Sequence, residues 1–235
     1  MNYARYGIIG AMPEEVEALR NIMTDVMEEN IGRKVFYTGL IAGKSVVLTC
    51  SGIGKVSAAT ATSVLIVKYH CDAIINTGVA GGLQDTAPLD LVISTATTQH
   101  DFDLTIFGYK PGQVPSFEPE IKACPELTKV AFEVAQKLGG EYNFNSHLGL
   151  IVSGDKFIAG AQERAHIDKN FPAAKATEME GAAIGETSAI FNVPYVVIRS
   201  ISDNADQKAN MTFEEVLPLA TRNSQEIIKR MMEAL

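Results

Sequence analysis

The stretch Tyr6-Gly7-Ile8-Ile9-Gly10-Ala11-Met12-Pro13-Glu14-Glu15 passes from an apolar run into a proline that is followed by two acidic residues. The apolar run predicts a buried strand over Tyr6–Gly10. Proline suits the first turn of a helix, and acidic side chains complement the positive end of the helix dipole, so a helix is predicted over Pro13–Glu29. A strand that leads directly into a helix is typical of α/β folds.

The same alternation continues along the 235-residue chain. Val35–Leu40 and Ser45–Cys50 flank a short Gly-containing turn and predict a hairpin. Further strands are expected at Ala73–Thr77, Leu91–Thr95, Leu148–Ser153 and Tyr195–Ser200, and helices at Lys55–Tyr69, Glu126–Leu138, Gln162–Asn170, Gly181–Phe191 and Phe213–Leu235. We therefore predict one α/β domain over residues 1–235, with three α/β/α layers around a twisted, mostly parallel central sheet that the hairpin makes mixed.

Charge and hydropathy argue against several classes of partner. The formal net charge of −8 disfavours a long basic surface for nucleic acid. No apolar run reaches the roughly 18 residues of a membrane span, and the N-terminus lacks the apolar core of a signal peptide. The three cysteines and four histidines fall in no metal-binding pattern. The expected protein is soluble and cytoplasmic, with no metal, organic cofactor, nucleic acid or membrane as partner.

Polar or Gly-rich segments follow several of the predicted strands. They are Gly10–Glu15, Ser51–Lys55, Gly78–Gly82, Ser153–Asp155 and Ser200–Asp203. Ligands of α/β sheets gather beyond the carboxyl ends of the strands, so these segments predict one shared pocket. Ser51–Val56 resembles half of a phosphate-binding Walker loop, but Thr49 replaces its first glycine and Val56 replaces its Ser or Thr. Close approach of the backbone to a ligand explains these glycines better.

Acidic residues are the sharper signal, although each has an ordinary structural explanation. Glu15 can simply complement the dipole at the start of its helix. Glu178 and Glu180 bracket Met179 before a Gly- and Ala-rich helix, and capping accounts for one of the two. Asp203 ends an apolar strand, where it is either the cap of the next turn or a partly desolvated functional carboxyl group. The long Pro-containing loop over Thr97–Pro125 is expected to be functional or intersubunit.

Together these segments resemble one family closely, the bacterial 5′-methylthioadenosine/S-adenosylhomocysteine nucleosidases of the nucleoside phosphorylase superfamily. The matching segments, which span nearly the whole chain in family order, are Gly7–Glu15, Ser51–Val56, Ile75–Gly78, Phe107–Pro115, Gly149–Asp155, Glu178–Gly181 and Arg199–Asp203. The resemblance implies a nucleoside phosphorylase-like fold. It also implies hydrolysis of the N-glycosidic bond of an adenine nucleoside in methionine salvage.

The resemblance gives three acidic residues catalytic roles. Glu15 would be the general base that activates water, and Asp203 the acid that protonates adenine N7. Glu180, with the backbone of Met179, would contact the ribose hydroxyls. These roles are chemically sensible, because departure of adenine leaves positive charge on the ribose, the leaving base needs a proton, and water needs a base on the opposite side.

The resemblance also implies contacts with the rest of the substrate. Phe157 would stack on adenine, and Ile158 would read its edge through backbone groups. The remaining substrate-binding residues implied are Ala80 and Gly81 beside the base and sugar, Met12, Ile53 and Phe213 at the sugar and alkylthio ends, and Glu178 and Arg199. Phe107 and Pro115 would complete the pocket of the neighbour in a homodimer.

Two positions favour water over phosphate as the attacking group. Related phosphorylases hold phosphate with an Arg and a Ser where this chain has Asn76 and Val79. The expected substrates are 5′-methylthioadenosine, S-adenosylhomocysteine and 5′-deoxyadenosine. Val79 and Gln99-His100-Asp101 are also similar to relatives that accept 6-amino-6-deoxyfutalosine. That hydrolysis, a purine nucleoside phosphorylase, and a nucleoside-binding protein without turnover remain the alternatives.

Overall fold

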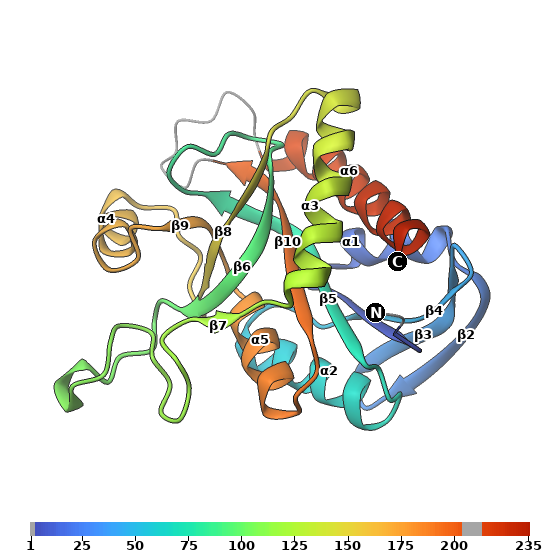
Figure 1. Cartoon of the computed structure of the whole chain (residues 1–235), viewed down its shortest axis with the longest axis horizontal. Coiled ribbons are helices and arrows are strands. Elements are labelled where there is room, and N and C mark those ends of the chain that lie inside the picture. The colour runs from blue at the N-terminus through green and yellow to red at the C-terminus, as the bar shows by residue number, and fades with distance from the viewer. Residues whose placement is uncertain (1–2, 204–212) are drawn as a thin grey trace.

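The computed structural model describes residues 3–203 and 213–235, which form a ten-stranded sheet with helices packed against it (Figure 1). The strands are β1 (Tyr6–Gly10), β2 (Thr24–Ile31), β3 (Lys34–Ile41), β4 (Lys44–Cys50), β5 (Ala73–Gly82), β6 (Leu91–Gln99), β7 (Ile121–Lys122), β8 (Ser146–Ser153), β9 (Ala174–Glu178) and β10 (Tyr195–Asp203). The helices are α1 (Pro13–Asn21), α2 (Lys55–Val67), α3 (Pro125–Tyr142), α4 (Ala161–Asn170), α5 (Gly181–Ile190) and α6 (Phe213–Ala234), with a 3-10 turn η1 (Thr105–Phe107). The predicted α/β class and the predicted hairpin are confirmed.

The centre of the sheet is parallel. β4, β1, β5 and β10 lie side by side in one direction, and Ile8 of β1 pairs with both Leu48 and Ile75. The strands β6, β8 and β9 form a second parallel set that runs opposite to the first. Gly81 near the end of β5 pairs with Thr177 near the end of β9, so the carboxyl ends of both sets meet there.

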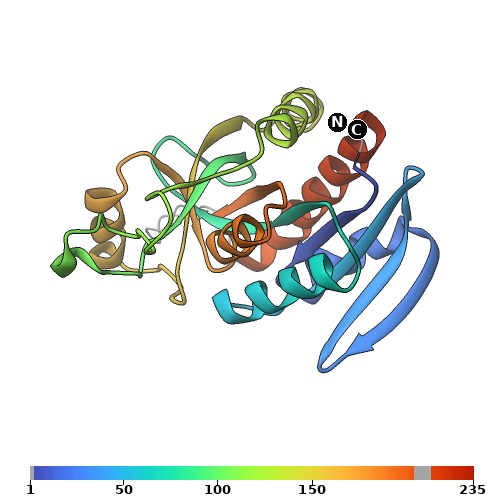
Figure 2. The same ribbon diagram turned by 60° about the horizontal axis from the view of Figure 1, so that its bottom comes forward.

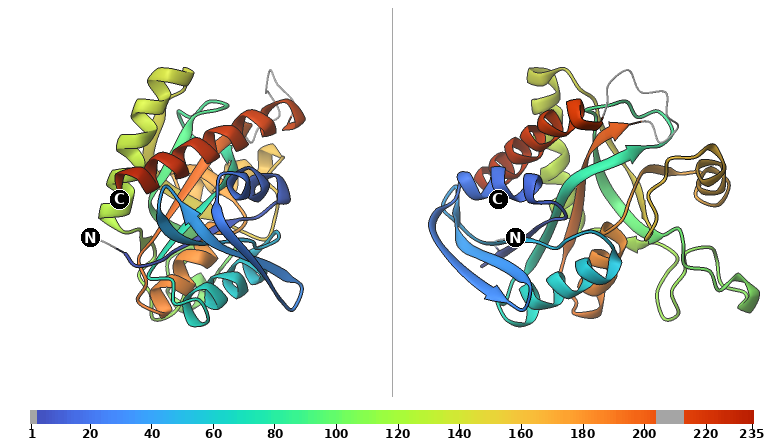
Figure 3. Two further views of the ribbon diagram at one scale, coloured as in Figure 1. Left: turned by 90° about the vertical axis from the view of Figure 1, so that its right-hand side faces the viewer. Right: turned by 180° about the vertical axis from the view of Figure 1, so that it is seen from behind.

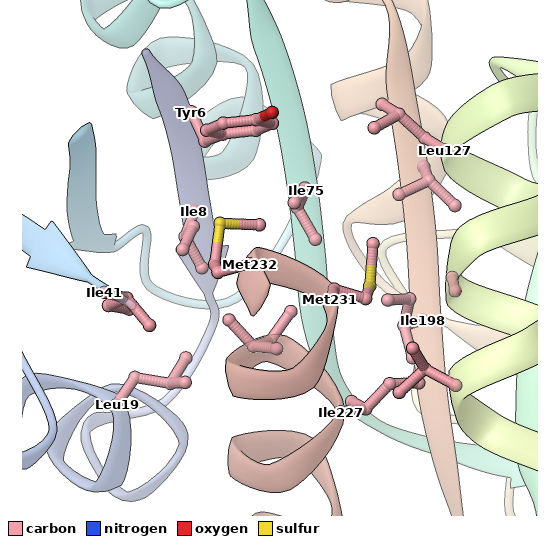
Figure 4. Close-up of a cluster of buried hydrophobic side chains, with 14 of the residues drawn as sticks. Tyr6, Ile8, Leu19, Ile41, Ile75, Leu127, Ile198, Ile227, Met231 and Met232 are labelled. Carbon is pink, nitrogen blue, oxygen red and sulfur yellow. The ribbon is translucent and has the colours of Figure 1, made fainter. Parts of the chain in front are cut away.

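Helices cover both faces of the sheet, as the three-layer prediction requires (Figures 2 and 3). On one face, α1, α3 and α6 share a core with the strands, and Figure 4 shows Met231 and Met232 of α6 against Ile8 and Ile198. Both methionines are fully buried, and such burial stabilises a fold by roughly 2 kcal/mol per side chain. On the other face, α2 and α5 pack against each other and the sheet through small residues such as Ala58 and Ala183.

The strands β2 and β9 were not predicted from the sequence. The prediction of a single helix over Pro13–Glu29 is wrong beyond Asn21, because Thr24–Ile31 forms the strand β2 beside β3. β2 is almost wholly exposed, so its side chains carry no periodic burial signal. β9 contains Ala, Lys and Thr instead of an apolar run, and its pairing with β5 and β8 makes it a strand.

The predicted irregular region projects from the body of the molecule at the lower left of Figure 1. The strand β6 continues to Gln99 and so includes the start of this region. Beyond Gln99, the regular elements in the region are η1 and the short strand β7. Across residues 3–203 and 213–235, no helix is both long and apolar enough to cross a membrane.

Candidate active site

One pocket of about 300 Å³ lies where the strand ends converge. Its wall draws on the segments that follow β1, β4 and β8 and on the ends of β5, β9 and β10. The residues are Ala11, Met12, Glu15, Ile53, Val79, Ala80, Gly81, Lys156, Phe157, Ile158, Thr177, Glu178, Met179, Glu180, Arg199, Ser202 and Asp203. The predicted convergence of strand ends on one pocket is therefore correct, and β9 contributes a further strand end.

Glu15 lies in the first turn of α1 and is 2% exposed. Its Oε2 accepts the N–H groups of Ala11 at 2.7 Å and Met12 at 3.1 Å, and its Oε1 accepts the N–H of Val79 at 3.1 Å. Burial raises the pKa of Glu15, while the charge of Arg199 and the three N–H donors oppose that rise. Oε1 accepts one of these bonds and retains a second lone pair for another donor.

Glu178 is a buried anchor in the pocket wall. Its carboxylate accepts hydrogen bonds from the N–H groups of Glu180 at 3.0 Å and Gly181 at 2.8 Å, at the start of α5. The hydroxyl of Ser153 and Nη2 of Arg199 also donate to it. Both oxygens are thus engaged within the protein. Glu178 thereby fixes the start of α5 and the guanidinium of Arg199.

Glu180 is also buried, but fewer hydrogen-bond donors and a more distant cation compensate its charge. Its Oε1 accepts the N–H of Gly54 at 2.8 Å, and its Oε2 lies 3.6 Å from Nη2 of Arg199. Burial and the neighbouring carboxylate of Glu178 raise the pKa of Glu180 to about 7, against the attraction of Arg199. Arg199 is therefore shared between carboxylates, and Glu178 holds it more closely.

Asp203 ends β10 at the pocket and is half-buried. The hydroxyl of Ser202 donates to its Oδ2 at 2.7 Å, and the same hydroxyl lies 3.2 Å from the carbonyl oxygen of Ala80. The register of β10 against β5 shifts between Ile201 and Asp203. Such an irregularity re-aims side chains, and here it lies at the residue that lines the pocket.

The apolar residues separate into two groups. Met12, Ile53, Ala80, Gly81, Phe157 and Ile158 line the pocket. Phe157 is 66% exposed and Ile53 61% exposed, so the rim offers uncovered apolar surface. Phe107 and Pro115 lie exposed on the projecting loop, apart from the lining residues of their own chain. The backbone of Phe213 begins α6, but its side chain lies outside the described part of the chain.

Two supporting residues were not assigned as site residues from the sequence. Ser153 holds Glu178, and its signal is its place in Ser153-Gly154-Asp155 at a strand end. Asn76 accepts from Nη2 of Arg199 at 2.6 Å and donates to the carbonyl oxygen of Ile9 at 2.9 Å. An amide within the apolar run of β5 needs buried partners, and that requirement is the signal that could have found it.

The cations in the pocket wall are already paired. Arg199 contacts Glu178 and Glu180, and Lys156 donates to Glu163 at 2.9 Å. Carboxylates outnumber cations among the lining residues. The described wall therefore favours positive over negative charge in the pocket.

Comparisons with known proteins agree with this geometry. The model of the family described as "Phosphorylase superfamily" matches residues 5–233. A 5′-methylthioadenosine/S-adenosylhomocysteine nucleosidase of Actinobacillus succinogenes is 47% identical over 98% of this chain and 99% of its own length. The nucleosidase of the same name from Neisseria meningitidis, solved in complex with methylthio-immucillin-A, superposes with a TM-score of 0.93 at 42% identity, covering 99% of this chain and 100% of that one. A futalosine hydrolase of Helicobacter pylori superposes at 0.89 with 33% identity, covering 98% of both chains.

Proposed function

The chain belongs to the 5′-methylthioadenosine/S-adenosylhomocysteine nucleosidases of the phosphorylase superfamily. We therefore propose that the carboxylates of its pocket have different roles in one hydrolysis reaction. The protein hydrolyses the N-glycosidic bond of 5′-methylthioadenosine and S-adenosylhomocysteine, and it releases adenine and the 5′-substituted ribose. Its near full-length similarity to nucleosidases of that name supports this activity.

Glu15 is the general base of the proposed mechanism. Its buried carboxylate accepts three backbone N–H groups, which hold it in place and favour its ionised form. Burial makes the carboxylate more basic, which suits a group that must take a proton from water near neutral pH. The remaining lone pair of Oε1 is available for the attacking water.

Asp203 is the acid that protonates N7 of the departing adenine. It lines the same pocket as Glu15 but comes from a different strand end, β10 instead of β1. A base and an acid on separate elements can act on opposite sides of the anomeric carbon, as an inverting hydrolysis requires. Phe157 and Ile158, which lie in the same wall, are assigned to adenine.

Glu180 contacts the ribose hydroxyls and favours positive charge on the sugar. Bond cleavage leaves an oxocarbenium-like ribose, and a nearby carboxylate stabilises that charge more than it stabilises the neutral substrate. The excess of carboxylates over cations in the wall acts in the same direction. It would also repel a phosphate dianion, which supports water as the attacking group.

The proposed active form is a homodimer in which Phe107 and Pro115 complete the neighbour's pocket. Phe107 is 74% exposed on its own chain, and Ile106 beside it is 86% exposed. Val56 on α2 and Ile190 at the end of α5 are also exposed. Large apolar side chains left exposed on a fold are candidates for a partner surface, and a second copy would cover them and the open rim of the pocket.

The observation that carries the mechanism is the placement of Glu15 and Asp203 in one pocket wall. Its test is release of free base from methylthioadenosine, S-adenosylhomocysteine, aminodeoxyfutalosine and inosine, with and without phosphate. We expect adenine from the first two and no sugar phosphate. Phosphate-dependent cleavage would identify a phosphorylase instead, and a strong preference for aminodeoxyfutalosine would favour the activity of the futalosine hydrolases.

A further inference from the structure

Three motifs of the sequence remain without a role in this mechanism. They are Lys55 in the incomplete Walker-like loop, Gln99-His100-Asp101 at the end of β6, and Asp155 after β8. All three meet beside the start of α2. Asp155 Oδ1 accepts the backbone N–H of Lys55 at 2.8 Å, and the backbone N–H of Asp155 donates to Asp101 Oδ2 at 2.8 Å.

The side chain of Lys55 closes this arrangement into a ring. Its Nζ donates to Asp101 Oδ1 at 2.6 Å and to Gln99 Oε1 at 2.8 Å. Burial acts to raise the pKa of Asp101, but the ammonium of Lys55 and the N–H of Asp155 hold it below its usual value. We call the ring of Lys55, Asp101 and Asp155 the α2 clamp. It ties the start of α2 to the ends of β6 and β8.

The α2 clamp lies one residue from Gly54, whose N–H holds the proposed ribose contact Glu180. Gly54, which precedes Lys55, donates its N–H to Glu180 Oε1 at 2.8 Å. Consecutive N–H groups at this helix end are therefore held by two carboxylates, Glu180 on the pocket side and Asp155 on the other. Gly54 has a φ of +95, and a Cβ there would lie 3.0 Å from Asp155 Oδ1, so this close approach suits glycine.

The clamp also reaches the proposed adenine platform, because Asp155 is two residues before Phe157. Gly154, between Ser153 and Asp155, has no room for a side chain, since a Cβ would lie 2.4 Å from Cε1 of His100. The chain from Asp155 to Phe157 is thus short, and it follows directly on the closely packed Gly154. Movement of Asp155 would disturb the ribose contact and the base contact together.

We propose that Asp155, supported by Lys55 and Asp101, is a positioning residue that holds Glu180 against the ribose through the N–H of Gly54. This inference rests on the proposed function, because it concerns the same nucleoside pocket. Asp155 touches no reacting atom. It fixes the backbone beside Gly54, whose N–H is accepted by the proposed ribose contact Glu180.

The test compares Asp155→Ala with wild type on methylthioadenosine and on its 2′-deoxy and 3′-deoxy analogues. A hydrogen bond to a charged group is worth about tenfold in an equilibrium or rate, so kcat/KM for methylthioadenosine should fall about tenfold. The analogue that lacks the hydroxyl held by Glu180 should lose much less. Asp155→Asn keeps an oxygen that can accept from Lys55 and should recover most of the activity.

Two further variants make the result specific. Lys55→Met keeps the apolar stem but opens the clamp, and it should reproduce the pattern of Asp155→Ala. Glu141→Ala removes a carboxylate that pairs with Arg230 between α3 and α6, and it should leave all three substrates unaffected. Equal losses on the parent and both deoxy analogues, or no loss at all, would overturn the positioning role alone. A wild-type protein that releases no adenine from methylthioadenosine would overturn the proposed function as well.

Discussion

Replacing Glu180 with glutamine should stabilise the ligand-free fold, and the gain should grow as the pH rises. Glu180 is buried beside Glu178, and its pKa is raised from 4.5 to about 7. A carboxyl group whose pKa is higher in the folded state favours the proton there, so its ionisation opposes folding. The amide introduced by Glu180→Gln would keep an oxygen for the N–H of Gly54 and would carry no charge at any pH.

The size of the effect follows from the two pKa values. Each pKa unit corresponds to about 1.4 kcal/mol, so the cost approaches roughly 3 kcal/mol once Glu180 is ionised in both the folded and unfolded states. At about pH 5 the folded protein still binds the proton, and the cost is below about 1 kcal/mol. Between these limits the stability of wild type relative to Glu180→Gln falls with rising pH, and above about pH 8 the difference levels off.

Urea unfolding of wild type and Glu180→Gln at several values from about pH 5 to about pH 8 measures this difference, with protein concentration held constant. Glu29→Gln is a control of opposite sign, because Lys68 and Tyr69 donate to Glu29 and hold its pKa below its usual value. That variant should be destabilised throughout the range and should gain nothing as the pH rises. A stability difference for Glu180→Gln that stays flat across the range would refute the reasoning.

The remaining predictions concern turnover. Glu15→Gln should lower kcat about a thousandfold while ligand binding persists, since an amide cannot take a proton from water; near-normal kcat would remove Glu15 from the role of base. Asp203→Asn should lower kcat by a similar factor of about a thousand, and a mild effect would exclude it as the acid. Phe107→Ala should raise KM about tenfold through lost apolar contact in the neighbour's pocket. Mixed dimers of Phe107→Ala and Glu15→Gln should regain one efficient pocket, whereas activity that merely averages the two parents would count against sharing.

The parts of the fold with strong local patterns could be predicted from the sequence. β1 and the first half of β10 are apolar runs, and Pro13 marks the start of α1. β2 could not be predicted, because an exposed Glu-containing segment has no burial period and becomes a strand only through pairing with β3. β9 could not be predicted for a similar reason, since it becomes a strand through pairing with partners from distant parts of the chain.

The candidate site also has features that could be predicted from the sequence and features that could not. The strand ends predicted that Glu15 and Asp203 share one pocket, and the family resemblance added Glu180, which also lines it. The different surroundings of Glu178 and Glu180 could not be read from their spacing, because Glu178 ends β9 and meets Arg199 of β10. The same limit applies to the α2 clamp, whose members lie far apart in the sequence and meet only because β6 and β8 end together.

The exposed strand β2 also affects the solubility of the protein. β2 lies at the end of the strand order and pairs with β3, so its outer backbone groups form an open edge. Such an edge can recruit a strand from another molecule and seed aggregation. Asp25 and Glu28 place negative charge along this edge, where two approaching copies would repel each other. An acidic edge can therefore be useful to the protein even where it lowers the strand propensity of the segment itself.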